Sequence, residues 1–353
     1  MHYAALGVKR ISSFLFALFI SCPPVSYIFM RGEIGMYRYR RLIHVAVFIM
    51  LILLTFNFRD NPFIFDEADT VSQPILKVKD KETDLYKRII QAKSSYEIEP
   101  QDAYIDRVWK KTPGRNGLQV NVEKSYENMK DEQTFNKSLL VFEEVKPGKS
   151  LKDLPASPIF RGHPNKDMVG FFINVSWGTE YIPDILNTLK QHKVKATFFI
   201  EGRWAKENAN LVKMIDEQGH VIGNHAYDHP DMAQLSEADN RKQITQTNDI
   251  IKAIVDKTPQ WFAPPSGSYN DAVVRIADDL DMETVLWTVD TIDWQNPSVS
   301  VMVKRVLDKV HPGATVLMHP TLSVANGLDT LITNLEDLGY QIGTIERLFH
   351  EGR

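Results

Sequence analysis

The feature that most constrains the fold is a regular alternation of short apolar runs and amphipathic segments from residue 168 onward. The runs at 168–175 and 196–200 are almost wholly apolar, as is typical of strands buried on both faces. The segments at 181–190 and 236–255 repeat apolar residues at helical spacing. The alternation continues through the segments 208–218, 220–223, 261–262, 270–280, 284–289, 298–310, 314–318 and 328–338. About seven strand–helix units predict an α/β fold with a parallel sheet covered by helices.

This order of elements fits both an open doubly wound sheet and a closed barrel. In both folds, functional side chains gather at the carboxyl ends of the parallel strands. Chemically unusual residues that directly follow a predicted strand are therefore the candidates for a functional site.

One candidate is a pair of histidines, His225 and His229, which follows the strand predicted at 220–223. Their spacing allows both imidazoles to face one point, and neutral imidazole is a common ligand for Zn and Co. The alternative is that both are ordinary loop histidines. The pair therefore predicts part of a site for a divalent metal, Zn or Co.

Two further candidates also follow predicted strands. The segment 289–294 reads VDTIDW and contains Asp290 and Trp294, and the apolar run at 316–318 ends at His319. A histidine oriented by a carboxylate is the usual construction of a general acid. The alternative is that Asp290 caps a turn and that His319 is a satisfied core residue.

Taken in order, these segments resemble the NodB homology domain of the polysaccharide deacetylases, carbohydrate esterase family 4. The resemblance covers about residues 169–349, and VKATFFIEG at 194–202 is similar to the family's most recognisable non-catalytic stretch. Four shorter segments are similar to its site motifs: GNHAYDHP at 223–230, FAPPSG at 262–267, DTIDW at 290–294 and LMH at 317–319. The resemblance implies a distorted (β/α) barrel and hydrolysis of N-acetyl groups on a GlcNAc- or MurNAc-containing polymer.

The resemblance also implies roles for individual residues. His225 and His229 are expected to hold the metal, His319 to act as the acid, and Asp290 to orient His319. The expected substrate-binding residues are Leu317, Trp294 and Pro264.

The first motif of the family is altered in this chain. The family places two adjacent aspartates, the base and then a metal ligand, before a glycine, whereas Ser176 and Trp177 precede Gly178 here. The family arginine that orients the base falls at Ala263. A buried arginine without its carboxylate is costly, so the loss of both is physically easier than the loss of one. Loss of a general base costs about 10²–10⁴-fold in rate.

We therefore expect a protein that binds or acts on N-acetylated cell-wall polysaccharide, with lost or strongly impaired deacetylase activity. The alternative is an active metal-dependent deacetylase of peptidoglycan in which Asn174, Glu180 or Asp228 replaces the missing carboxylates. Trp177 and Trp294 could stack on sugar rings, and core packing is the alternative for both.

The N-terminal region contains an apolar run at 42–56 that follows a basic cluster at 38–41. This order predicts a signal-anchor helix at 36–58 in the cell membrane, crossing once, with the barrel on the extracellular side. Cleavage of the helix, which gives a secreted protein, is the alternative. Residues 1–35 are expected to be an extra leader, because Met36 opens a complete basic and apolar segment of its own.

The rest of the chain divides into a polar linker at 59–96, a small α/β accessory unit at 97–160 and the deacetylase-like domain at 167–350. The single cysteine, Cys22, excludes a structural disulfide outside the N-terminal region. The net charge of −4 provides no basic field for nucleic acid. The expected partners are cell-wall polysaccharide and, through the N-terminal helix, the membrane.

Overall fold

The computed structural model describes residues 47–48, 50 and 84–353, and Lys79–Arg353 forms one compact unit. The expected leader at 1–35, nearly all of the expected anchor at 36–58 and most of the linker lie outside the described residues. Among the residues that are described, no helix has both the length and the apolarity of a membrane span.

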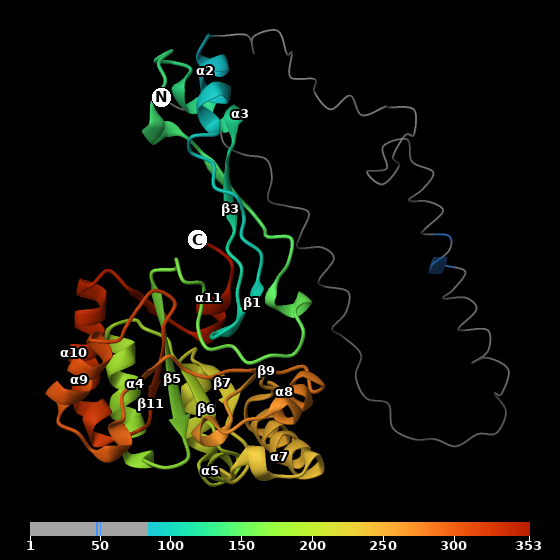
Figure 1. Ribbon diagram of the computed structural model, residues 1–353, viewed down its shortest axis with the longest axis vertical. Helices are drawn as coiled ribbons and strands as arrows, with labels where there is room; N and C mark the ends of the chain where they lie inside the picture. Colours follow the sequence, from blue (N-terminus) through green and yellow to red (C-terminus); the bar gives the residue numbers. More distant parts are fainter. Residues whose placement is uncertain (1–46, 49, 51–83) are drawn as a thin grey trace, which may run out of the picture. The chain divides into compact units, whose positions relative to one another are not determined.

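The central element of this unit is an eight-stranded sheet in which every pair of neighbouring strands is parallel (Figure 1). The order is β10-β11-β5-β6-β7-β8-β9, and β12 pairs with the beginning of β5. The strands are β5 (Met168–Val175), β6 (Thr197–Ile200), β7 (Val221–Asn224), β8 (Trp261–Phe262), β9 (Glu283–Thr284), β10 (Val289–Asp290), β11 (Thr315–Met318) and β12 (Gln341–Gly343). The sheet curls and stays open between β9 and β10, so the predicted distorted (β/α) barrel is confirmed.

The single strand predicted at 284–289 is wrong. β9 pairs with β8, whereas β10 pairs with β11 at the other end of the sheet. The residues between these two short strands cross the open side of the barrel, and their apolar character reflects burial rather than one continuous strand.

Helices follow the strands, and most of them cover the outer face of the sheet; the last one instead packs through Ile345, Leu348 and Phe349 against the interior cluster that contains Phe172 and Phe199. The helices are α4 (Ile182–Gln191), α5 (Gly202–Glu207), α6 (Ala209–Glu217), α7 (Glu237–Val255), α8 (Asp271–Asp278), α9 (Val299–Leu307), α10 (Leu322–Asp337) and α11 (Ile345–Phe349). Side-chain caps fix several helix starts: the Ser236 hydroxyl accepts from the Asp239 N–H before α7, and Thr321 caps α10 in the same way. α10 packs between α4 and α9 (Figure 1).

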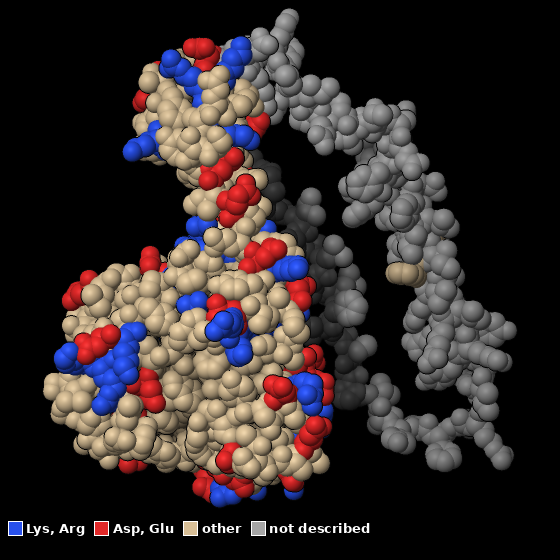
Figure 2. Space-filling model, in the orientation of Figure 1, with Lys and Arg blue, Asp and Glu red and all other residues tan. Residues whose placement is uncertain are grey.

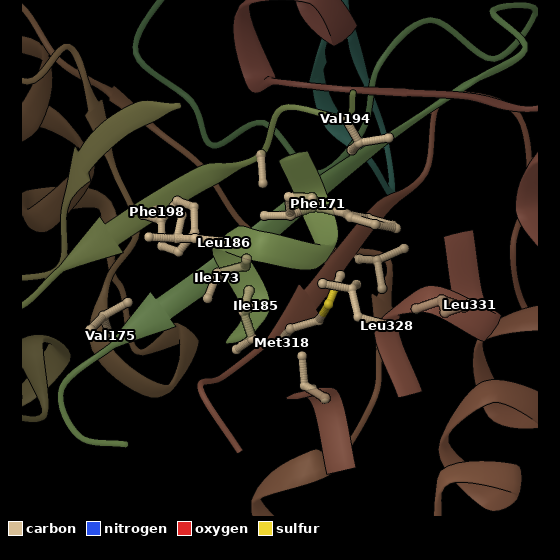
Figure 3. Close-up of a cluster of buried hydrophobic side chains, with 14 of the residues drawn as sticks. Phe171, Ile173, Val175, Ile185, Leu186, Val194, Phe198, Met318, Leu328 and Leu331 are labelled. Carbon is tan, nitrogen blue, oxygen red and sulfur yellow. The ribbon is translucent and has the colours of Figure 1, made fainter. Parts of the chain in front are cut away.

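β5 is buried at all eight positions because it has an apolar environment on both faces. Phe171, Ile173 and Val175 face the helices, where Ile185, Leu186, Leu328 and Leu331 from α4 and α10 surround them (Figure 3). Phe172 points to the other face, into the barrel interior, where it contacts Phe199 of β6 edge to face. This central strand leads directly to the altered first motif.

The accessory unit contains two helices and two antiparallel strand pairs. These elements are α2 (Asp84–Lys93), α3 (Val122–Met129), β1 (Tyr104–Asp106) with β2 (Lys110–Thr112), and β3 (Gly117–Val120) with β4 (Phe142–Val145). α2 lies in a segment that we expected to be linker. It forms because Leu85 and Ile89, four residues apart on a polar helix, become fully buried against Val120 and Met129.

The accessory unit is joined to the barrel along the edge strand β9. Ile159 is fully buried and pairs with Val285; its N–H donates to the Thr284 carbonyl oxygen at 2.9 Å. Beside it, the buried Lys111 Nζ donates to both carboxylate oxygens of Glu283, at 2.7 and 2.8 Å. The backbone groups of this sheet edge are thus paired within the chain rather than left open.

Candidate functional site

Polar and aromatic side chains gather at the carboxyl ends of the strands, as expected for this fold. Ser176 and Trp177 follow β5, Glu201 follows β6, His225 follows β7 and His319 follows β11. Because the strands are parallel, their carboxyl ends meet at one rim, and residues that are far apart in sequence lie close together there.

Gly178 holds the altered first motif against the loop that carries His319. Its φ is +72°, and a Cβ at this position would lie 1.9 Å from the carbonyl oxygen of Pro320. No other residue fits such an approach. The segment is fixed further by Trp204, whose indole N–H donates to the Thr179 hydroxyl at 3.0 Å.

Trp177 stacks on the imidazole of His319. The two rings have a centroid separation of 5.9 Å and an interplanar angle of 9°. Trp177 is 45% exposed, whereas the side chain of His319 is 17% exposed. The indole, at the position where the second aspartate of the family was expected, therefore covers one face of the expected acid and keeps a broad surface toward solvent.

The carboxylate that orients His319 is Asp293, not Asp290 as we predicted. The Nδ1 atom of His319 lies 2.8 Å from Oδ1 of Asp293, and the His319 backbone N–H donates to Oδ2 at 2.6 Å. Asp293 is completely buried. Asp290 instead accepts from the Ile292 N–H at 2.8 Å, because it ends β10 and its side chain closes the following turn.

His225 and His229 lie with their rings 5.2 Å apart at an angle of 71°. The Nδ1 atom of His225 donates to the Ala263 carbonyl oxygen at 2.7 Å, which leaves Nε2 as the free acceptor of a neutral ring. Burial first, and then His229, lower the pKa of His225 to about 3. Burial also lowers the pKa of His229, and His319 adds to this effect. Both rings are therefore neutral at pH 7, the form that metal ligands require.

The donor set nevertheless does not complete a metal site. Within residues 84–353, no three His, Cys, Asp or Glu side chains lie close enough together to hold an ion. A zinc site uses at least three protein ligands, so two neutral imidazoles are an incomplete set. The residues present thus do not fit the Zn or Co that the sequence led us to expect.

The three residues considered as replacements for the missing carboxylates do not supply a ligand. Asp228 is engaged by Arg203 at 3.1 Å and by the Gln243 amide at 2.7 Å. Glu180 is exposed to solvent. Asn174 points into the barrel interior, where its Oδ1 atom is buried without a hydrogen-bond partner in the described part of the chain.

Glu201 is a site carboxylate that the sequence interpretation missed. It is 7% exposed, and its backbone N–H donates to the Val175 carbonyl oxygen at 2.9 Å, beside Ser176, the residue expected at the position of the family's base. Burial raises the pKa of Glu201, and the neighbouring Ser176 hydroxyl partly opposes this rise. The available signal was an acidic residue directly after the apolar run TFFI, where a buried strand reaches the rim.

The remaining predicted residues divide into buried and exposed groups. Leu317 and Pro264 are buried, and Ala263 is packed in the interior cluster with Phe172 and Phe199. Trp294 is 53% exposed in the turn that follows β10. Trp177 and Trp294 are therefore the site residues that present large aromatic surfaces to solvent.

The chain is similar to known proteins in sequence. A model of the family described as polysaccharide deacetylase matches residues 161–285. The uncharacterized protein YlxY of Bacillus subtilis is 45% identical over 315 residues, which cover 89% of this chain and 99% of that protein. The peptidoglycan-N-acetylglucosamine deacetylase of Bacillus cereus is 35% identical over 199 residues, or 55% of this chain and 72% of the relative.

The chain is also similar to solved structures of this family. BA3943, described as a CE4 family pseudoenzyme from Bacillus anthracis, matches with a TM-score of 0.72 and 54% identity over 76% of this chain and 96% of its own. A BA3943 mutant described as having restored enzymatic activity also has a TM-score of 0.72, with 52% identity over 76% of this chain and 99% of its own. The similar proteins therefore include an inactive protein and a reactivated form of it.

Proposed function

The chain belongs to the polysaccharide deacetylase family, carbohydrate esterase family 4, and from this membership we propose that it binds N-acetylated cell-wall polysaccharide without deacetylating it. One observation carries the proposal. Where the family has its base and a metal ligand, this chain has Ser176 and a solvent-exposed Trp177 stacked on His319.

The half of the machinery that would activate water is missing. A serine hydroxyl is too weak a base to replace a carboxylate near neutral pH. The metal that supplies Lewis-acid chemistry in the family lacks its third ligand among the described residues. His319 and Asp293 keep the arrangement of an oriented acid, which is insufficient alone.

The site retains surfaces suited to a sugar polymer. Trp177 and Trp294 are both about half exposed at the same rim of the barrel. An aromatic ring offers a flat apolar surface of the kind that packs against the apolar face of a pyranose. The names of the relatives point to N-acetylglucosamine-containing peptidoglycan as the polymer class.

Replacement of either tryptophan is expected to weaken polysaccharide binding. We expect Trp177→Ala and Trp294→Ala each to reduce the affinity for an N-acetylglucosamine tetramer by about tenfold, the loss of roughly 1.4 kcal/mol of stacking. Isothermal titration calorimetry on the purified protein measures this change. Phe142→Ala is the control, because Phe142 is an exposed aromatic residue of β4, outside the site. Equal affinity in all four proteins would refute sugar binding at this rim.

We also propose that residues 36–58 hold the protein in the cell membrane, with the compact unit Lys79–Arg353 outside the cell. The apolar run at 42–56 and the basic residues before it support this placement. Protease added to intact protoplasts should then remove the compact unit. Full protection of that unit until the cells are lysed would show that the orientation is wrong.

A further inference from the structure

A hollow lies at the amino ends of the strands, opposite the rim that carries the candidate site. This cavity of about 510 Å³ is formed where the accessory unit, the beginnings of β5 and β12, α11 and the C-terminal residues meet. Four of its lining side chains are cationic: Arg115, Lys166, Arg347 and Arg353. Elsewhere, on the face shown in Figure 2, Lys and Arg are interspersed with Asp and Glu.

None of the four cations forms an ion pair with a carboxylate in the described part of the chain. Lys166 Nζ donates to the carbonyl oxygens of Arg347 and His350, at 2.7 and 2.6 Å. Arg353 Nε donates to the Asn116 carbonyl oxygen at 2.6 Å. The Nε atom of Arg115 is buried and has no partner among the described residues. Neutral acceptors thus hold these groups, and no direct ion pair with a described carboxylate neutralises them.

The four cationic groups are close enough for each to disfavour the charged form of its neighbours. The pKa of Lys166 falls to about 8, first because of burial and then because of Arg115 and Arg347. Burial also lowers the pKa of Arg115, and Arg353 adds to this effect. The neighbouring His163 has its pKa lowered to about 4 by burial and then by the same guanidinium groups, so it is neutral.

Three carboxylates lie nearby and offset only part of this charge. Glu144 accepts from the Asn116 amide at 2.5 Å and from the Arg353 backbone N–H at 3.1 Å. Asp167 favours the charged form of Arg115, and Glu351 favours that of Lys166, but in both cases burial and neighbouring cations outweigh them.

We propose that this cavity binds a phosphate-type oxyanion. Partly desolvated cations without carboxylate partners are stabilised by an anion between them, and guanidinium groups match the tetrahedral oxygens of phosphate through paired hydrogen bonds. The site is separate from the polysaccharide rim and does not depend on binding there. The same chemistry is available from free inorganic phosphate and from a phosphodiester group.

Calorimetric titration of the full chain at constant ionic strength tests the site with three probes: inorganic phosphate, dimethyl phosphate and acetate. We expect phosphate to bind, and Arg115→Gln and Arg347→Gln each to weaken it by about tenfold. Arg347 is exposed, so its variant should stay folded even if Arg115→Gln does not. Lys213→Gln, an exposed position on α6, is the matched control and should bind phosphate normally.

The probes also distinguish the source of the anion. Binding of dimethyl phosphate together with phosphate indicates a phosphodiester group, whereas binding of phosphate alone indicates the free ion. At pH 8, binding should take up protons, because an anion raises the pKa of Lys166. An absence of binding by both phosphate compounds, or unchanged phosphate affinity in Arg347→Gln, would overturn the proposal. Affinity for the N-acetylglucosamine tetramer, measured in the same variants, reports separately on the polysaccharide rim.

Discussion

Ser176→Asp, Trp177→Asp and Ala263→Arg, introduced together, are expected to convert the protein into a metal-dependent deacetylase. The carboxylate introduced by Trp177→Asp would add the third ligand to His225 and His229, and the one introduced by Ser176→Asp would supply the base. The expected gain in acetate release is at least about 10²–10⁴-fold over the unaltered protein, the usual contribution of a general base. A BA3943 mutant described as having restored enzymatic activity is 52% identical to this chain, which supports the expectation.

The single substitutions should not achieve this result. Ala263 is 2% exposed and lies in an apolar cluster, so Ala263→Arg alone buries an unpaired charge and should lower the free energy of unfolding by about 3 kcal/mol or more. Adding Ser176→Asp should recover much of that loss, because the introduced groups pair. Urea unfolding of the two variants measures the recovery, and an absence of recovery would show that positions 176 and 263 do not interact.

Glu201 should lower the activity of the reactivated enzyme at acidic pH. It lies against residue 176, so Ser176→Asp places two carboxylates side by side and raises the pKa of the new base. Because a base acts only when ionised, activity should fall as the pH drops through this raised pKa. Adding Glu201→Gln should move that limb of the pH–rate profile to lower pH. An unchanged profile would exclude a direct influence of Glu201.

Substitutions made in the reactivated triple variant can show which of the two aspartates in DTIDW supports His319. Asp293→Asn should reduce turnover strongly, because Asp293 holds the imidazole of His319. Asp290→Asn should have little effect, because its side chain only closes a turn. A larger loss of turnover in Asp290→Asn than in Asp293→Asn would show that Asp290 orients His319, as the sequence alone suggested.

Glu283→Ala is expected to destabilise the protein by about 3–5 kcal/mol, because it leaves the charge of a buried lysine without a partner. The side chain of Lys111 is 1% exposed, and both oxygens of Glu283 accept from its ammonium group. This pair joins the accessory unit to the edge of the barrel beside Ile159. Thermal unfolding followed by circular dichroism measures the loss.

A matched variant separates the buried charge from lost packing. Adding Lys111→Met to Glu283→Ala removes the stranded ammonium and should regain most of the stability, since an apolar side chain of similar length suits a buried position. If Glu283→Ala unfolds at the same temperature as the unaltered protein, this contact does not contribute to the stability of the unit.

The sequence predicts the barrel well because its central strands are apolar on both faces. The wholly buried β5 is an unmistakable run, whereas β12 has three residues with one exposed and depends on pairing with β5. α2 was missed because its few apolar residues are buried only against distant parts of the accessory unit. Short elements of this kind are determined by tertiary contacts rather than by local pattern.

At the site, residue types were easier to predict than partners. The histidines and the altered motif were visible in the sequence because their spacing and order carry the information. The choice between Asp290 and Asp293 depends on a turn in which Ile292 has a φ of +51°, which no periodicity reveals. Glu201 was overlooked for a related reason: its importance comes from Ser176, which directly follows the adjacent strand β5.

The central claim is that the site binds polysaccharide but cannot deacetylate it. The most direct test incubates the unaltered protein with Zn or Co, removes free ion, and measures both bound metal and acetate released from N-acetylglucosamine oligomers and peptidoglycan. We predict no stoichiometric metal and no acetate above the blank. Stoichiometric metal, together with acetate release that His225→Ala abolishes, would contradict the claim and show that the protein is an enzyme.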